Sequence, residues 1–88
     1  MDVAARFAEN LIRCRKRADL SQEGLGIRAS LHRTEISLLE RGTRIPRIDT
    51  LVKLAGALSV SPCELLDGIV WRPGSTSAGG FESPVDRL

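Results

Sequence analysis

The stretch HRTEIS, residues 32–37, gathers side chains that can exchange hydrogen bonds with the edges of base pairs. The planar fork of Arg33 suits guanine or a phosphate, and the hydroxyls of Thr34 and Ser37 can both donate and accept. His32 adds a polar ring at the start of the stretch. A helix that presents these side chains on its outer face could read a DNA sequence.

The other reactive residue types do not form a catalytic or metal-binding set. The chain has one histidine, scattered carboxylates and two cysteines, Cys14 and Cys63, that are far apart in the sequence. We therefore predict no enzyme activity, no metal site and no cofactor. The cysteines are interpreted as small apolar side chains in a reducing cytosol.

Two short helices joined by a tight corner are predicted to position the polar stretch. Apolar residues in LSQEGLGIRASLHRTEISLLERGTRIP keep a helical spacing, lose it near residue 30 and then resume it. Ser21 is a suitable N-cap for a helix over Gln22–Ala29. The second helix is expected over Arg33–Arg41, with Gly42 as a left-handed cap and Pro46 preventing continuation.

Such a pair has the form of a helix-turn-helix, whose first helix crosses the DNA backbone and whose second lies in the major groove. The close approach of the two helices needs a small residue midway along the first, where Gly26 stands. Four apolar residues are predicted to bury the inner side of the pair: Leu25, Leu31, Ile36 and Leu39.

A first helix is predicted over residues 3–18. Its apolar face would contain Phe7, Ala8, Leu11, Ile12 and Ala18. The basic run Arg13, Arg15, Lys16 and Arg17 near its end is either a solvated helix end that matches the helix dipole or an edge that faces phosphates.

Two further helices complete an all-α, five-helix domain over residues 1–68, with the helix-turn-helix at about 21–41. The fourth helix is expected over Ile48–Leu58, with Leu51, Leu54, Ala55 and Leu58 inward. The fifth begins with the capping-box pattern of Ser61, Pro62 and Glu64 and ends near residues 67–68.

The remaining residues, 69–88, form a tail rich in Pro, Gly and Ser. The tail is either a disordered end, or Val70–Trp71 pairs with the region around Phe81 as a small β-hairpin or dimerisation arm. We expect partial order, because the single tryptophan of the chain would otherwise lie in water.

Size and charge place limits on function. A domain of 88 residues buries a small core, so dimerisation would supplement its stability. Residues 1–48 hold ten Lys/Arg against six Asp/Glu, or +4, whereas residues 49–88 hold three against five, or −2. The N-terminal half is therefore expected to face a polyanion. The chain lacks a long apolar stretch, so we expect no membrane span and a cytoplasmic location.

The segment LSQEGLGIRASLHRTEISLLERGTRIPRIDTLVKLAGALSVSPCELL, Leu20–Leu66, resembles the lambda-repressor-like helix-turn-helix family of the Cro/Xre type. The most specific pieces are LSQE, TEISLLERGTRIP and DTLVKLAGALSV. The resemblance implies the fold of that family and DNA as the partner. It also implies that the fifth helix and the segment beyond it take part in dimerisation.

The resemblance implies contacts to the DNA backbone at both ends of the helix pair. Gln22 would hold a phosphate with its side chain and the helix N-terminus, or would only begin the helix. Arg44 and Arg47 would run beside the sugar-phosphate backbone. Apart from the resemblance, His32 either adds a phosphate contact or is an ordinary surface residue.

The resemblance also places base-reading residues on the second helix. Arg33 would pair with guanine or contact a phosphate, and Thr34 and Ser37 would touch bases, phosphates or water. Leu38 would meet a thymine methyl group or pack at the rim. Together the predicted DNA-binding residues are Gln22, His32, Arg33, Thr34, Ser37, Leu38, Arg44 and Arg47.

Some positions depart from the family pattern or are acidic. Ser30 stands where relatives usually carry glycine, at a cost of about 1 kcal/mol if its backbone is left-handed. His32 replaces a better N-cap residue. Glu40 is expected in an ion pair with an arginine of the first or second helix. Glu35 either favours the dipole of its own helix or accepts a bond from cytosine.

These observations predict a sequence-specific transcriptional regulator that binds a near-palindromic operator as a homodimer. A repressor, a restriction–modification controller and an antitoxin are the roles considered. The alternative prediction is an antitoxin or other interaction module that sequesters a partner protein through its tail.

Overall fold

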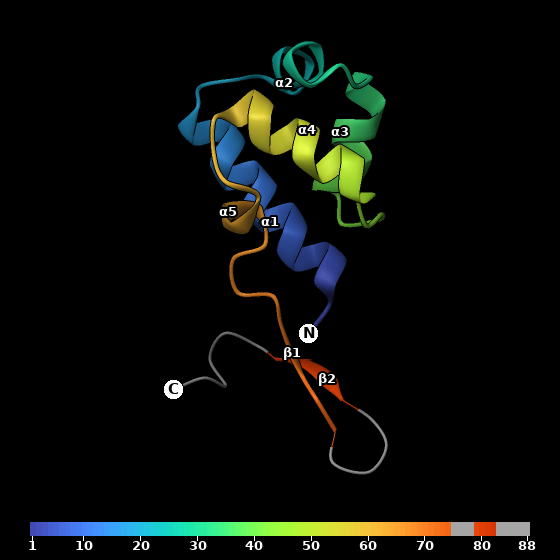
Figure 1. Cartoon of the computed structure of the whole chain (residues 1–88). Coiled ribbons are helices and arrows are strands. Elements are labelled where there is room, and N and C mark those ends of the chain that lie inside the picture. The colour runs from blue at the N-terminus through green and yellow to red at the C-terminus, as the bar shows by residue number, and fades with distance from the viewer. Residues whose placement is uncertain (75–78, 83–88) are drawn as a thin grey trace.

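The structure is a computed structural model that describes residues 1–74 and 79–82. Its elements are α1 Val3–Arg17, α2 Gln22–Ala29, α3 Arg33–Glu40, α4 Ile48–Leu58, α5 Pro62–Leu65, β1 Val70–Arg72 and β2 Gly80–Glu82 (Figure 1). Five helices and a two-stranded tail confirm the predicted fold class. No helix in the described ranges is long and apolar enough to cross a membrane.

The helix boundaries follow local capping chemistry. Ser21 accepts a hydrogen bond from the Gly24 N–H at 2.9 Å, as expected for the N-cap of α2. Ser61 caps α5, accepting from the Cys63 N–H at 3.2 Å. The second half of the predicted capping box does not form, because the Glu64 carboxylate pairs with Arg17 of α1 instead.

The core lies where α1, α2, α3, α4 and α5 meet. Its buried members are Phe7, Leu11, Cys14, Leu25, Ala29, Ile36, Leu39, Leu54, Ala55, Ala57, Leu58 and Leu65. Leu31 and Leu51 pack against it while partly exposed. Ala18 was wrongly placed on the apolar face: it follows the last residue of α1 and is exposed. The sequence pattern also missed Asn10, which is fully buried.

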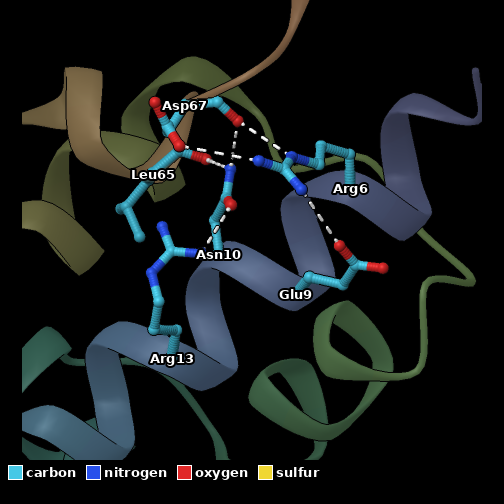
Figure 2. Close-up of polar contacts among 6 residues, drawn as sticks. All are labelled: Arg6, Glu9, Asn10, Arg13, Leu65 and Asp67. Carbon is cyan, nitrogen blue, oxygen red and sulfur yellow. Dashed lines mark hydrogen bonds and ion pairs between the residues drawn. The ribbon is translucent and has the colours of Figure 1, made fainter. Parts of the chain in front are cut away.

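Asn10 joins α1 to the end of α5. Its Nδ2 donates to the carbonyls of Leu65 and Asp67, each at 2.9 Å, and its Oδ1 accepts from Arg13 at 3.2 Å (Figure 2). Arg6 donates to the same Asp67 carbonyl at 3.1 Å. Every polar atom of the buried amide group that can bond does so, and the start of the tail is thereby fixed to α1.

The tail forms the hairpin that was one of the two alternatives. β1 and β2 are antiparallel, with Trp71 opposite Phe81, and the two rings meet edge to face with centroids 5.2 Å apart. The hairpin extends away from the helices (Figure 1). The predicted tail also includes residues 75–78 and 83–88, which lie outside the described residues.

Candidate nucleic-acid interface

The corner between α2 and α3 is held by a close backbone approach. A Cβ atom added at Gly26 would lie 2.7 Å from the Leu31 carbonyl oxygen, so the position requires glycine. The Leu31 N–H donates to the Gly26 carbonyl at 2.9 Å. Ser30, between them, has φ +56° and ψ +42°, the left-handed conformation expected from its place in the corner.

His32 begins α3 as an N-cap through its ring. Its Nδ1 accepts from the Thr34 N–H at 3.0 Å. A ring nitrogen that accepts carries no proton, so a neutral His32 has its proton on Nε2 and can donate there. His32 therefore caps α3 and also offers an N–H donor at the surface.

The first turn of α3 presents the predicted reading residues to solvent. Arg33 and Thr34 are exposed, and Ser37 and Leu38, one turn on, are partly exposed. Within residues 1–74 and 79–82 no ion pair or hydrogen bond engages the Arg33 side chain. Its guanidinium therefore keeps all of its donors for an external partner.

A largely buried ion pair joins α1 to α3. Arg15 of α1 donates to Glu40 of α3 from Nε at 2.6 Å and from Nη2 at 3.0 Å, with side chains only 14% and 5% exposed. The bidentate hydrogen bond to Glu40 raises the pKa of Arg15 above its ordinary value. The ion pair expected for Glu40 is thus confirmed.

Gln22 of α2 completes that network. Its Nε2 donates to Glu40 Oε1 at 3.1 Å. Because a carboxylate only accepts, this bond fixes which end of the amide is nitrogen. The sequence did not reveal the contact, since the two residues lie 18 positions apart with a corner between them.

The basic run places three cations in the last turn of α1, as the helix-dipole alternative requires, and two of them also pair with acidic side chains. Arg15 is drawn inward by Glu40, and Arg17 pairs with Glu64 of α5. Arg13 donates to Asn10. Arg15 and Arg17 therefore tie α1 to α3 and α5, whereas the Arg13 bond stays within α1.

The loop after α3 carries the two remaining predicted residues. Arg44 pairs with Glu35 of α3, and Arg47 pairs with Asp49 at 3.2 Å with both side chains largely exposed. Gly42 has φ +71°, as the left-handed cap prediction requires. Glu35 lies in the first turn of α3, as the helix-dipole interpretation requires. Its contact with Arg44 was not predicted, because a partner nine residues away across a loop has no periodic signal.

A family model described as helix-turn-helix (HTH_3) matches residues 11–65, more than half of the chain. The chain belongs to this helix-turn-helix family. The match includes α2, the corner and α3, and it confirms the lambda-repressor-like resemblance together with the repressor-like structures below.

Three relatives illustrate the family. Control protein C.BamHI of Bacillus amyloliquefaciens is 47% identical over 51 residues, 58% of this chain and 63% of that protein, so the chain spans less than two thirds of that relative. The restriction-modification controller protein C.AhdI from Aeromonas hydrophila has a TM-score of 0.69 at 35% identity, covering 70% of this chain and 94% of that one. The DNA-binding domain of the P22 C2 repressor has a TM-score of 0.67 at 32% identity, covering 70% and 82%.

These helix-turn-helix relatives are named for regulation and DNA binding rather than for catalysis. The comparisons therefore support a DNA-binding regulator.

Proposed function

We propose that this protein is a sequence-specific transcriptional regulator that binds a near-palindromic operator as a homodimer. In this proposal residues 1–68 are the DNA-binding domain and residues 69–88 are a tail that serves dimerisation. The observation that carries the proposal is the exposed first turn of α3, where Arg33 has no partner within the described structure. The α2–α3 corner that positions this turn is tightly packed, because Gly26 leaves no room for a side chain.

Base reading is assigned to the outer face of α3. Arg33 donates two hydrogen bonds to one guanine, which discriminates among bases by about 1–3 kcal/mol. Thr34 and Ser37 supply hydroxyls on the same helix, and Leu38 meets a thymine methyl group. Ser37 and Leu38 are only partly exposed, whereas Arg33 is exposed on the surface. Their short side chains are therefore assigned bases that lie close to the helix.

Backbone contacts are assigned to residues on either side of α3. Gln22 uses one amide N–H for Glu40 and keeps the other for a phosphate. His32 donates from Nε2, and Arg44 and Arg47 use guanidinium N–H groups beyond those held by Glu35 and Asp49. These contacts supply affinity that depends on salt and not on sequence.

Among regulatory roles, that of a restriction–modification controller is supported by the relatives. C.BamHI is named a control protein and C.AhdI a restriction-modification controller. The corresponding expectation is an operator with two half-sites about 34 Å apart, one for each α3 of the dimer.

Selection of bound duplexes from random DNA tests the proposal directly. The purified full chain should enrich sites with two inverted half-sites centred about one helical turn apart. Sedimentation of the complex should give two chains per duplex. Failure to enrich any sequence over the starting pool, at ordinary ionic strength, would overturn the proposed function.

One observation favours the second candidate, an antitoxin or other module that sequesters a partner protein. Trp71 and Phe81 are 54% and 44% exposed on the projecting hairpin, where a partner protein could cover them. Removal of residues 69–88 separates the two functions. A regulator that uses the tail for dimerisation loses operator affinity, whereas a sequestering module loses its partner and keeps its DNA binding.

A further inference from the structure

A hollow of about 460 Å³ lies between the start of α3, the loop after α3 and one side of α4. Six of the residues that line it are charged or carry a ring donor: His32, Glu35, Arg44, Arg47, Asp49 and Lys53. They come from four separate parts of the chain, from the α2–α3 corner to the middle of α4. A volume of this size falls within the range of ligand sites.

The charges inside the hollow do not cancel. Glu35 forms an ion pair with Arg44. Asp49 forms an ion pair with Arg47 and accepts a hydrogen bond from the Thr50 N–H at 3.0 Å. Lys53 is the remaining cation. It is exposed, and no ion pair to it is found in the part of the chain that the structure describes. Three cations against two carboxylates leave an excess of +1.

The donors are likewise in excess of the acceptors. Lys53 offers three N–H bonds, His32 offers Nε2–H, and each arginine retains N–H groups beyond the one given to its carboxylate. Both carboxylates already accept from partners. A ligand suited to this hollow is therefore anionic and has several acceptor oxygens.

We propose that Lys53, on α4, is a DNA-backbone residue, and that the hollow between α3 and α4 seats one phosphodiester of the operator against Lys53 and His32. This inference rests on the proposed function and extends it. The phosphate contacts would then continue from the loop onto the side of α4, which the sequence resemblance does not assign. A free phosphate anion has the same chemistry, and the test distinguishes the two sources.

The experiment replaces operator phosphates one at a time with neutral methylphosphonates and measures the dissociation constant of the full chain for each duplex. The unaltered protein should lose roughly tenfold at each contacted position, as expected for the loss of one hydrogen bond to a charged group. With Lys53→Gln, one position per half-site should lose that sensitivity, and the slope of log K against log salt should flatten by about 0.9. Lys53→Arg should restore both.

Lys16→Gln is the matched control, because it removes one exposed lysine charge from α1, outside the hollow. It should leave the sensitivity at the Lys53 position intact. Equal sensitivity profiles for Lys53→Gln and the unaltered protein would overturn the proposal, as would loss confined to one base sequence. Saturable binding of inorganic phosphate at Lys53, followed by chemical shifts, together with an unchanged methylphosphonate profile would assign the hollow to the free anion and overturn the proposal. If the unaltered protein binds no duplex, the proposed function itself fails. If it binds but Lys53→Gln changes no methylphosphonate sensitivity, only the proposal for Lys53 fails.

Discussion

At the scale of single residues, Arg33 separates sequence reading from general attraction to DNA. An arginine that contacts a phosphate binds all duplexes alike, whereas one that pairs with guanine distinguishes one base pair. Arg33→Ala is expected to cost about 1–3 kcal/mol on the preferred operator and to relax discrimination at one position per half-site. Dissociation constants for operators varied at each position measure both effects.

Arg33→Lys is the control for charge. It keeps the positive charge but loses the planar fork, so discrimination should fall while the salt dependence stays unchanged. Arg33→Ala that weakens preferred and unrelated duplexes by the same factor would assign Arg33 to the phosphate backbone.

The sequence predicted which residues lie at this surface better than it predicted their partners. Arg33 and Thr34 were expected on the outer side of a helix from spacing alone, and they are exposed. The contacts of Gln22 with Glu40 and of Arg44 with Glu35 join residues 18 and 9 positions apart. No periodic pattern connects such pairs, because the connection depends on how helices cross.

At the scale of elements, the helices were predictable because their ends are marked by local chemistry. Ser21, Gly42 and Pro62 each fix a boundary through a cap, a left-handed residue or a restricted φ, and the structure begins or ends its helices there. The face of α1 was less certain, because buried Asn10 looks polar in the sequence. Only the carbonyls at the end of α5, 55 or more residues away, explain its burial.

Two glycines in different helices should respond oppositely to the same substitution. Gly26→Ala would place a Cβ 2.7 Å from the Leu31 carbonyl oxygen, whereas Gly56→Ala meets nothing within 4 Å. We expect Gly26→Ala to lower the free energy of unfolding by about 1–2 kcal/mol, since the overpacking cost exceeds the helix gain. Gly56→Ala should raise it by about 0.5–1 kcal/mol. Urea unfolding measures both, and a stabilising Gly26→Ala would contradict the tight corner.

The junction of α1 and α5 depends on Asn10. Asn10→Ala leaves the Leu65 and Asp67 carbonyls without the side-chain donor, and each buried unsatisfied group costs about 1–3 kcal/mol. We expect a total loss of about 2–4 kcal/mol in the free energy of unfolding, because Arg6 still serves Asp67. Circular dichroism during urea unfolding gives the value.

Asn10→Asp and Arg13→Ala are the comparison variants for the stability loss of Asn10→Ala. Aspartate has the same shape but cannot donate when ionised, so it should be at least as harmful as alanine. Arg13→Ala removes only the part-buried bond to Asn10 Oδ1 and should cost about 1 kcal/mol, less than either substitution of Asn10. Equal stability of all three variants would show that the buried amide does not fix the junction.

At the scale of the whole molecule, the hairpin extends away from α2 and α3, the helices of the proposed DNA-binding surface. A two-stranded hairpin is marginally stable by itself, and this one leaves Trp71 and Phe81 about half exposed. A second copy that covers both rings would bury apolar area and would hold the two α3 helices at a fixed separation. The sequence alone left the hairpin as one of two alternatives, because its strands are three residues each and the sequence between them is rich in Gly and Ser.

Trp71 is the only tryptophan of the chain and therefore reports on such a dimer. With rising protein concentration its fluorescence emission should shift to the blue as its ring leaves water, and the shift should coincide with dimerisation measured by sedimentation. Covering the rest of Phe81 would contribute about 1 kcal/mol per subunit, so Phe81→Ala should weaken the dimer roughly 30-fold. Ile27→Ala, which truncates a 75% exposed side chain on α2, should leave the dimer unchanged. A blue shift that does not depend on concentration, or a dimer that Phe81→Ala does not weaken, would place the subunit contact elsewhere. The hairpin would then be available to a different protein. Only an interface that includes these two rings couples their burial to the pairing of the two α3 helices.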